Sequence, residues 1–275
     1  MAVARIRDYS FKPKWNRGLV KGAGAKEGRR LLGVELEVVF EDVPSSDDAL
    51  GHIGRWAGAR GDGEGKLAEI VVKHDGSLPG GGEDGDRDTG FEVVFHPAHF
   101  EALKGRLQKV GRALNEAGAY DAHGDAGLHV HIARRGLSLG AQGAFLVFWN
   151  HLRHTELVKL AGRGDGEYTK KQDRALETPF QALMDETGHY FRVDAGRPET
   201  LEVRVFASTL KLPALLGRVQ MVDAVAAYCA THPLTPRLAT QAWREVYTLS
   251  AFMEWVKSLG WKYEEFRNYA ESLGY

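Results

Sequence analysis

The chain has 275 residues, a formal net charge of −1 at pH 7, 43% hydrophobic and 10% aromatic residues, and one cysteine. This composition is typical of a globular protein, and the length allows a substantial core. The near-neutral charge gives no electrostatic reason for nucleic-acid binding, and the single cysteine excludes an intramolecular disulfide and any multi-cysteine metal site.

No segment has the pattern of a membrane span or an export signal. Apolar runs stay below the roughly 18 residues of a membrane helix, and the N-terminus lacks the apolar centre of a signal peptide. We therefore expect a cytoplasmic protein without membrane contact. Cys229 lies in an apolar helical run, VDAVAAYCATHP, and is interpreted as a small buried hydrophobe rather than a nucleophile.

Residues 1–30 are basic, contain glycine and show no sustained hydrophobic period, so they are predicted to form an N-terminal arm. A solvated leader is a simpler interpretation of this arm than a nucleic-acid contact. No Pro/Gly/Ser linker divides the remainder, which predicts one domain over 31–275. The acidic, glycine-rich stretch 80–90 has two interpretations, a mobile surface loop or a lid over the site.

The rest of the chain contains both strand and helix patterns. Strands are expected at 31–40, 67–74, 91–97, 127–135, 188–195 and 200–209. Helices are expected at 48–60, 98–118, 141–162, 213–232, 240–260 and 262–274. Pro97 is expected to end the third strand, and Gly118 and Gly162 to end two helices. This order predicts an α+β fold with a mostly antiparallel sheet, helices packed on one face and a polar site on the other.

Three short motifs place ionisable side chains two residues apart inside these strands. Because residues i and i+2 of a strand project from the same face, each pair points into one space. Buried charges are costly unless they are paired or bind a metal, so three such pairs indicate a polar site built on a sheet. The pairs are Glu35 and Glu37, His129 and His131, and Glu202 and Arg204.

Each motif also has a simpler explanation. Glu35 and Glu37, with Glu92 in FEVVFHP, offer carboxylate oxygens to a cation such as Mg²⁺, or they face water from an edge strand. The two histidines could bind zinc or another metal, donate to phosphate, or be structural. Glu202 and Arg204 could pair with each other, or divide the work between a cation and a phosphate.

The order of the motifs resembles that of the amidoligases, which belong to the carboxylate–amine ligase superfamily with glutamine synthetase and glutamate–cysteine ligase. The succession is GVELEV, DGSL, FEVVFHP, GLHVHI, a helix followed by an Arg/Tyr loop, and TLEVRVFASTL, within residues 31–275. The resemblance implies a glutamine-synthetase-like fold with a curved antiparallel sheet, ATP, and two or more Mg²⁺ or Mn²⁺ ions.

The resemblance also implies a role for each matching residue. Phosphate binding falls to Arg204 and Arg163, and Asp75 of the DGS turn would lie at the substrate end. Either histidine fits the metal; we place His129 there and His131 near phosphate. One departure is His96-Pro97, where the family has Ser-Pro. The implied metal ligands are Glu35, Glu37, Glu92, His129 and Glu202, and the implied catalytic residues are Arg204, His131 and Asp75.

The implied reaction is ATP-dependent formation of an amide or peptide bond through an acyl phosphate. It would join a small-molecule, peptide or protein carboxylate to an amine. One alternative is a non-catalytic binding or assembly module that retains the ligase fold. Another is a zinc-dependent hydrolase that uses His129 and His131 to hold the metal.

Overall fold

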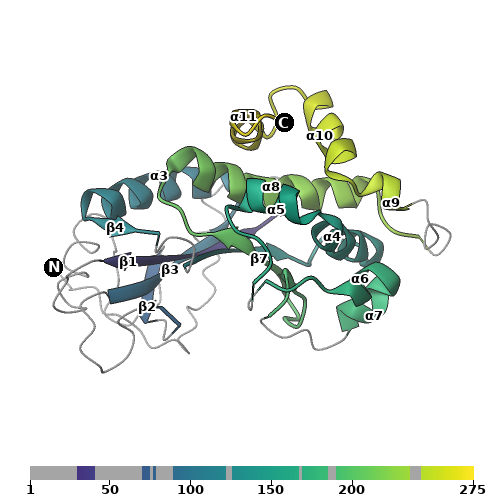
Figure 1. Cartoon of the computed structure of the whole chain (residues 1–275), viewed down its shortest axis with the longest axis horizontal. Coiled ribbons are helices and arrows are strands. Elements are labelled where there is room, and N and C mark those ends of the chain that lie inside the picture. Colours follow the sequence, from purple (N-terminus) through teal and green to yellow (C-terminus); the bar gives the residue numbers. More distant parts are fainter. Residues whose placement is uncertain are drawn as a thin grey trace. The chain divides into compact units, whose positions relative to one another are not determined.

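The structure is a computed structural model that describes residues 30–40, 70–74, 77–78, 89–121, 126–166, 169–184, 190–235 and 243–275 (Figure 1). The chain divides into two compact units, Met1–Leu128 with Ala207–Leu215, and His129–Phe206 with Leu216–Tyr275. Residues 1–29 of the arm expected at 1–30, the helix at 48–60, Asp75 and most of the glycine-rich stretch lie outside the described residues. The organisation of 31–275 as one domain stays a prediction.

The strands of the first unit pair in the order β2-β3-β1, and a short strand, β4, also pairs with β1. All of these pairs are antiparallel. Directly opposed residues of such a pair face the same side, so the register places Glu37, Glu92 and Lys73 together. Leu36 and Val93 alternate with them and are completely buried. The bounds are β1 (Leu32–Phe40), β2 (Ile70–His74), β3 (Thr89–Ala98) and β4 (Ala119–Tyr120).

Strand β3 continues past the proline that was expected to end it. Pro97 lies within the strand, which ends at Ala98, so the prediction of a stop at Pro97 is wrong. The pairing of β3 with β1 shifts register between Leu32 and Val34, next to this end of β3. Proline has no N–H for the ladder and is tolerated at such irregularities, which explains why the strand continues.

Helix α3 (Phe100–Glu116) follows β3 and confirms the helix predicted at 98–118. Its buried side chains recur at helical spacing, including Phe100, Leu103, Leu107 and Val110, so one face of the helix is apolar. Gly118 has a φ of +83°, the left-handed conformation that commonly ends a helix and favours glycine. The end of α3 at this glycine is therefore a local property of the sequence.

The second unit contains the last strands of the chain. Strand β5 (Gly127–Ala133) begins in the first unit and ends in the second. Strand β7 (Thr200–Ala207) lies between β5 and the short β6 (Val193–Asp194), and β7 and β6 are antiparallel. Together with the strands of the first unit, these pairs confirm the predicted α+β fold with a mostly antiparallel sheet. β6 is shorter than the strand predicted at 188–195.

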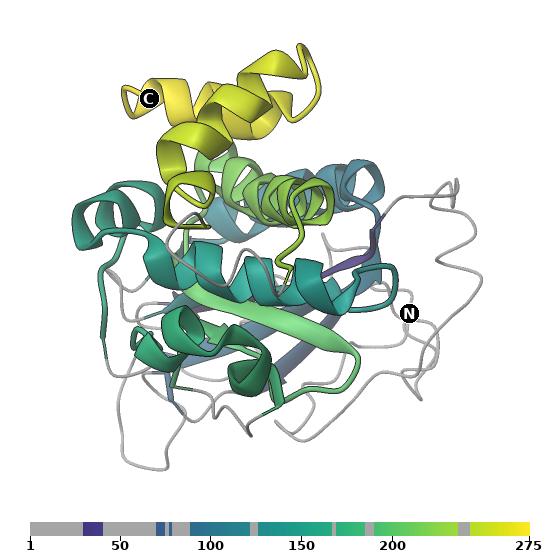
Figure 2. The same ribbon diagram turned by 90° about the vertical axis from the view of Figure 1, so that its right-hand side faces the viewer.

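Helices make up most of the second unit. Helix α4 runs along β7 (Figure 2), and the rings of Trp149 on α4 and Phe206 on β7 pack edge to face with centroids 5.7 Å apart. Cys229 is buried, as predicted. Among the residues that the structure describes, no helix is both long and apolar enough to cross a membrane. The helices are α4 (Leu139–His151), α5 (His154–Ala161), α6 (Asp173–Glu177), α7 (Pro179–Met184), α8 (Leu212–Thr231), α9 (Trp243–Val246), α10 (Leu249–Ser258) and α11 (Glu264–Ser272).

The single long helix predicted at 141–162 is wrong, because the segment forms α4 and α5 with a break at Leu152. The cause is tertiary. The guanidinium of Arg192 donates to the carbonyls of Trp149 and Leu152, each at 3.0 Å, and so satisfies oxygens at the end of α4. At the start of α5 the carboxylate of Glu156 accepts the backbone N–H of Arg153 at 2.9 Å and pairs with its guanidinium, and α5 ends at Gly162 as predicted.

Candidate functional site

The first unit gathers acidic side chains on one face of its strands. Glu35 and Glu37 lie two residues apart on β1, and Glu37 is directly opposite Glu92 on β3. Lys73 on β2 is opposite Glu92 from the other side. This carboxylate cluster (Glu35, Glu37, Glu92 and Lys73) therefore contains three acids and one ammonium group. Because the cluster contains more acidic than basic groups, its charge would be compensated by a further cation.

Because most of the cluster is buried, ionisation of its acidic side chains costs free energy. Lys73 Nζ lies 3.3 Å from Glu92 Oε2, and both side chains are buried. Burial, together with the charge and hydrogen bond of Glu35, raises the pKa of Glu92 to about 9, although Lys73 acts in the opposite direction. Two carboxyl groups that share one lysine in a buried place cannot both ionise cheaply, and a divalent cation would remove this penalty.

Glu37 has a second task in the same unit. Its Oε2 accepts the backbone N–H of Gly127, the first residue of β5, and its carbonyl accepts the hydroxyl of Ser208. One carboxylate oxygen of Glu37 is therefore held by the backbone. If this residue binds a cation, it does so chiefly through the other oxygen.

The second unit gathers cationic groups around a buried carboxylate on β7. Glu202 is completely buried, and its Oε1 accepts from Arg204 Nη1 at 2.5 Å. His129 Nδ1 lies 3.7 Å from the same oxygen, and Arg197 Nε lies 2.9 Å from Oε2. This β7 cluster (His129, Arg197, Glu202 and Arg204) thus confirms that Glu202 and Arg204 share a face, and a second buried carboxylate, Asp194, lies opposite Glu202 and 4.0 Å from Arg197 Nε.

Arg197 is the member of the β7 cluster that the sequence analysis missed. It lies in the turn between β6 and β7, where Gly196 donates its N–H to Asp194 Oδ1 at 2.8 Å. The turn folds the arginine back onto β7, five positions before Glu202 in the sequence. The only signal in the sequence was the unusual Gly-Arg-Pro turn beside a strand that carries a glutamate and an arginine.

Of the remaining predicted residues, His131 and Arg163 belong to the part of the chain that the structure describes, and Asp75 does not. His131 lies on β5, two positions after His129, and is buried. Arg163 follows α5 and directs its guanidinium at the backbone of β7, with Nη2 donating to the carbonyl of Arg204 at 2.7 Å. Asp75 lies outside the described residues.

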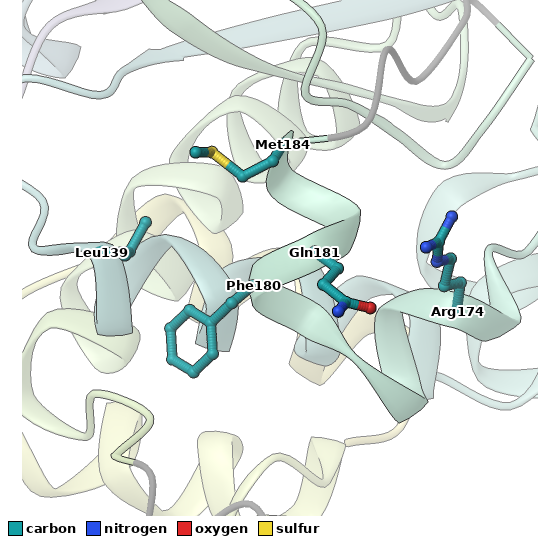
Figure 3. A pocket seen from close by; sticks show the side chains of 5 residues that line it. All are labelled: Leu139, Arg174, Phe180, Gln181 and Met184. Atoms are coloured by element: carbon teal, nitrogen blue, oxygen red, sulfur yellow. The ribbon is translucent and has the colours of Figure 1, made fainter.

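A separate open groove of about 480 Å³ lies at the start of α4 and along α6 and α7. Figure 3 shows Phe180 and Leu139 on one side of it and Arg174 on the other. Its lining contains none of the predicted site residues, so it adds nothing to the clusters above. The lining residues are Leu139, Arg174, Phe180, Gln181 and Met184.

No family model and no curated protein matches the chain. Among solved structures it is similar to GmaS (gamma-glutamylmethylamide synthetase) with ADP, at 13% identity and a TM-score of 0.46, over 94% of this chain and 72% of that chain. It is also similar to the complex between prokaryotic ubiquitin-like protein Pup and its ligase PafA, at 12% identity and a TM-score of 0.34, over 80% of this chain and 51% of that chain. A third similarity is to 3-hydroxy-3-methylglutaryl-coenzyme A reductase of Streptococcus pneumoniae, at 15% identity and a TM-score of 0.18, over 88% of this chain and 75% of that chain. The function proposed below is argued from the residues of this chain alone.

Proposed function

We propose that the chain is an ATP-dependent carboxylate–amine ligase that uses Mg²⁺ or Mn²⁺. The observation that supports this most is the arrangement on β7, where the buried carboxylate of Glu202 lies beside the guanidinium of Arg204. The Nε of Arg204 is buried and has no hydrogen-bond partner among the described residues. A carboxylate suits a cation and a guanidinium with a spare donor suits a phosphate oxygen, so the two side by side suit a metal–nucleotide.

The carboxylate cluster of the first unit supports the metal requirement. Glu35, Glu92 and the second oxygen of Glu37 would hold a cation, whose positive charge would offset the burial and the repulsion from Glu35 that now raise the pKa of Glu92. His129 and Glu202 are the proposed ligands in the second unit. The bound cations would supply charge stabilisation to the phosphate oxygens during transfer.

In the proposed reaction, an oxygen of the substrate carboxylate bonds to the γ-phosphorus of ATP as the bond from that phosphorus to the bridging oxygen breaks and ADP leaves. The amine nitrogen then bonds to the acyl carbon, inorganic phosphate leaves with the bonding electrons, and the nitrogen loses a proton. Phosphoryl transfer depends mainly on positioning and charge neutralisation. Arg204 and His131 are proposed to hold the phosphates, and Asp75 is proposed to lie at the substrate end.

The substrates are proposed as chemical classes and not as particular compounds. The carboxylate belongs to a small molecule, a peptide or a protein, and it is joined to an amine in the cytoplasm. A zinc hydrolase built on His129 and His131 would give Arg197 and Arg204 no task, although both arginines lie within 3 Å of Glu202. The geometry therefore favours the ligase.

The test is calorimetric titration of the whole chain with ADP and with a non-hydrolysable ATP analogue, with and without Mg²⁺. We expect binding that requires the metal and that weakens at least tenfold in Glu202→Gln, because one charge-assisted contact contributes about 1.4 kcal/mol or more. Glu254→Gln, an exposed glutamate on α10, is the matched control and should bind like the wild type. Wild-type protein that binds no nucleotide with either metal would favour the non-catalytic module.

A further inference from the structure

The backbone of β7 loses a regular hydrogen bond at Arg204. The register pairs Val193 with Val203 and Asp194 with Glu202, so the next opposed pair is Arg192 and Arg204. In a regular antiparallel ladder every second opposed pair exchanges two N–H···O bonds, and Arg192 and Arg204 occupy such a position. Arg204 donates its N–H to the carbonyl of Arg192 at 3.0 Å, but Arg192 donates its own N–H to Lys170, also at 3.0 Å. The carbonyl of Arg204 is therefore left without its ladder donor.

The side chain of Arg163 supplies the missing donor. Its Nη2 donates to the carbonyl of Arg204 at 2.7 Å, and its Nε donates to the carbonyl of Val205 at 3.4 Å. A buried carbonyl without a partner would cost free energy, so this contact stabilises the irregular backbone. The planar fork of a guanidinium can reach two neighbouring acceptors at once, which a lysine cannot do in the same way.

An ion pair between the buried Arg192 and the partly exposed Asp165 fixes the loop that carries Arg163. Two residues further along, Asp165 accepts from Arg192 Nε at 2.7 Å and Nη2 at 2.8 Å. Arg192 is almost completely buried, and its Nη1 holds the end of α4. Thr169 closes the same loop through Gly164 and Gly166. The segment 162–166 is thus tied to the rest of the second unit at both of its charged residues.

These contacts form a closed ring that begins and ends at the backbone of Arg204. The backbone of Arg204 bonds to Arg192, the side chain of Arg192 to Asp165, and the side chain of Arg163, two residues from Asp165, to the backbone of Arg204. We infer that Arg163, Asp165 and Arg192 are positioning residues that fix the guanidinium of Arg204 against its phosphate. Together with Arg204 they form the Arg204 network. The inference rests on the proposed function only for the identity of the ligand.

The inference gives Arg163 a different task from the phosphate contact that the family resemblance implies. Both of the donors described above are directed at backbone carbonyls. Its effect on a nucleotide would therefore pass through Arg204. A residue that acts only through another one shows no additional effect once that other residue is removed.

The first test is a double-mutant cycle on the affinity for ADP with Mg²⁺. Arg163→Met should weaken binding about tenfold in the wild-type background and leave it unchanged in the Arg204→Met background. The reason is that Arg163 is inferred to act on the nucleotide only through Arg204, so that the interaction energy of the cycle equals the whole loss caused by Arg163→Met. Arg153→Met, an exposed arginine paired with Glu156, is the control and should bind normally. Equal tenfold losses in both backgrounds would make Arg163 a direct ligand, and no loss in either would make it purely structural; both results overturn the inference.

A second variant and a second measurement keep the test independent of folding and of the ligand. Asp165→Asn breaks the same network at its ion pair and should show the same dependence on Arg204, with a smaller loss. In NMR of protein labelled on arginine nitrogen, the Arg204 Nε–H signal, assigned by its absence in Arg204→Lys, should shift or broaden in Arg163→Met without nucleotide. An unchanged signal refutes the inference. Wild-type protein that binds no ADP refutes the proposed function instead, and the NMR result then decides the inference alone.

Discussion

Replacement of Glu92 by glutamine should stabilise the metal-free protein at neutral and alkaline pH. The folded state raises the pKa of this carboxyl from 4.5 to about 9, with burial as the largest cause and Glu35 as the next. The folded state therefore binds the proton more tightly than the unfolded state. The resulting stability is complete below pH 4.5 and is lost as the pH rises toward 9. Glutamine stays neutral, so Glu92→Gln should escape this loss.

The size of the effect follows from the pKa values. Each pH unit between the unfolded and the folded pKa removes about 1.4 kcal/mol, so the wild type should lose up to about 3 kcal/mol between pH 5.5 and 8. That is a large share of the roughly 5–15 kcal/mol by which proteins are stable. A difference of 1 kcal/mol would already be measurable.

The assay is urea unfolding with a chelator present, at several pH values from 5.5 to 8. The free energy of unfolding of Glu92→Gln minus that of the wild type should grow steadily with pH. Glu116→Gln, an exposed glutamate at the end of α3 in the same unit, should follow the wild type at every pH. A difference that stays constant with pH, or a variant that is the less stable protein at pH 8, would refute the reasoning.

Four further outcomes can be checked. Mg²⁺ or Mn²⁺ should raise the melting temperature of the wild type at pH 8 and raise that of Glu92→Gln much less, because a cation that binds only the folded state stabilises it. Partial desolvation acts to raise the pKa of Asp165, but the ion pair with Arg192 outweighs it and the pKa is lowered. Asp165→Asn should therefore lose its destabilisation relative to wild type as the pH falls through the folded pKa, measured by acid unfolding. Gly217→Ala should destabilise by about 1–3 kcal/mol in urea, since the new Cβ would lie 2.5 Å from the Cβ of Tyr269 on α11; an unchanged midpoint would contradict the packing. Arg197→Ala should destabilise the protein in urea by about 1–3 kcal/mol, because it removes the cation 2.9 Å from Oε2 of the completely buried Glu202 while Arg204 still holds Oε1; an unchanged midpoint would contradict this.

The part of the site that could be predicted from the sequence depends on local geometry. The alternation of a strand is enough to place Glu202 and Arg204 on one face, and the structure brings them to 2.5 Å. The same rule places Glu35 with Glu37, while the meeting with Glu92 depends on the register between β1 and β3. Alternation is intrinsic to the backbone of a strand, so the pairs within one strand can be predicted without knowledge of the fold, whereas the contact with Glu92 cannot.

The parts that could not be predicted depend on contacts that the local alternation of strands and the period of helices do not determine. The break between α4 and α5 depends on Arg192, which lies 40 residues or more from the carbonyls that it binds. Arg197 is only five residues from Glu202, but it joins the site because the Gly-Arg-Pro turn folds it back onto β7, which strand alternation alone does not predict. In the first case a tertiary contact outweighs a local pattern, and in the second the geometry of a turn decides.

Arg192 links three segments: its side chain binds the end of α4 and the 162–166 loop, and its backbone carbonyl accepts the N–H of Arg204 on β7. Proteins open in contiguous cooperative units, and we expect segments held by one buried residue to belong to the same unit. Backbone amides in these three places should therefore exchange their hydrogens with similar opening free energies. A ligand that steadies any one of them would slow exchange in all three.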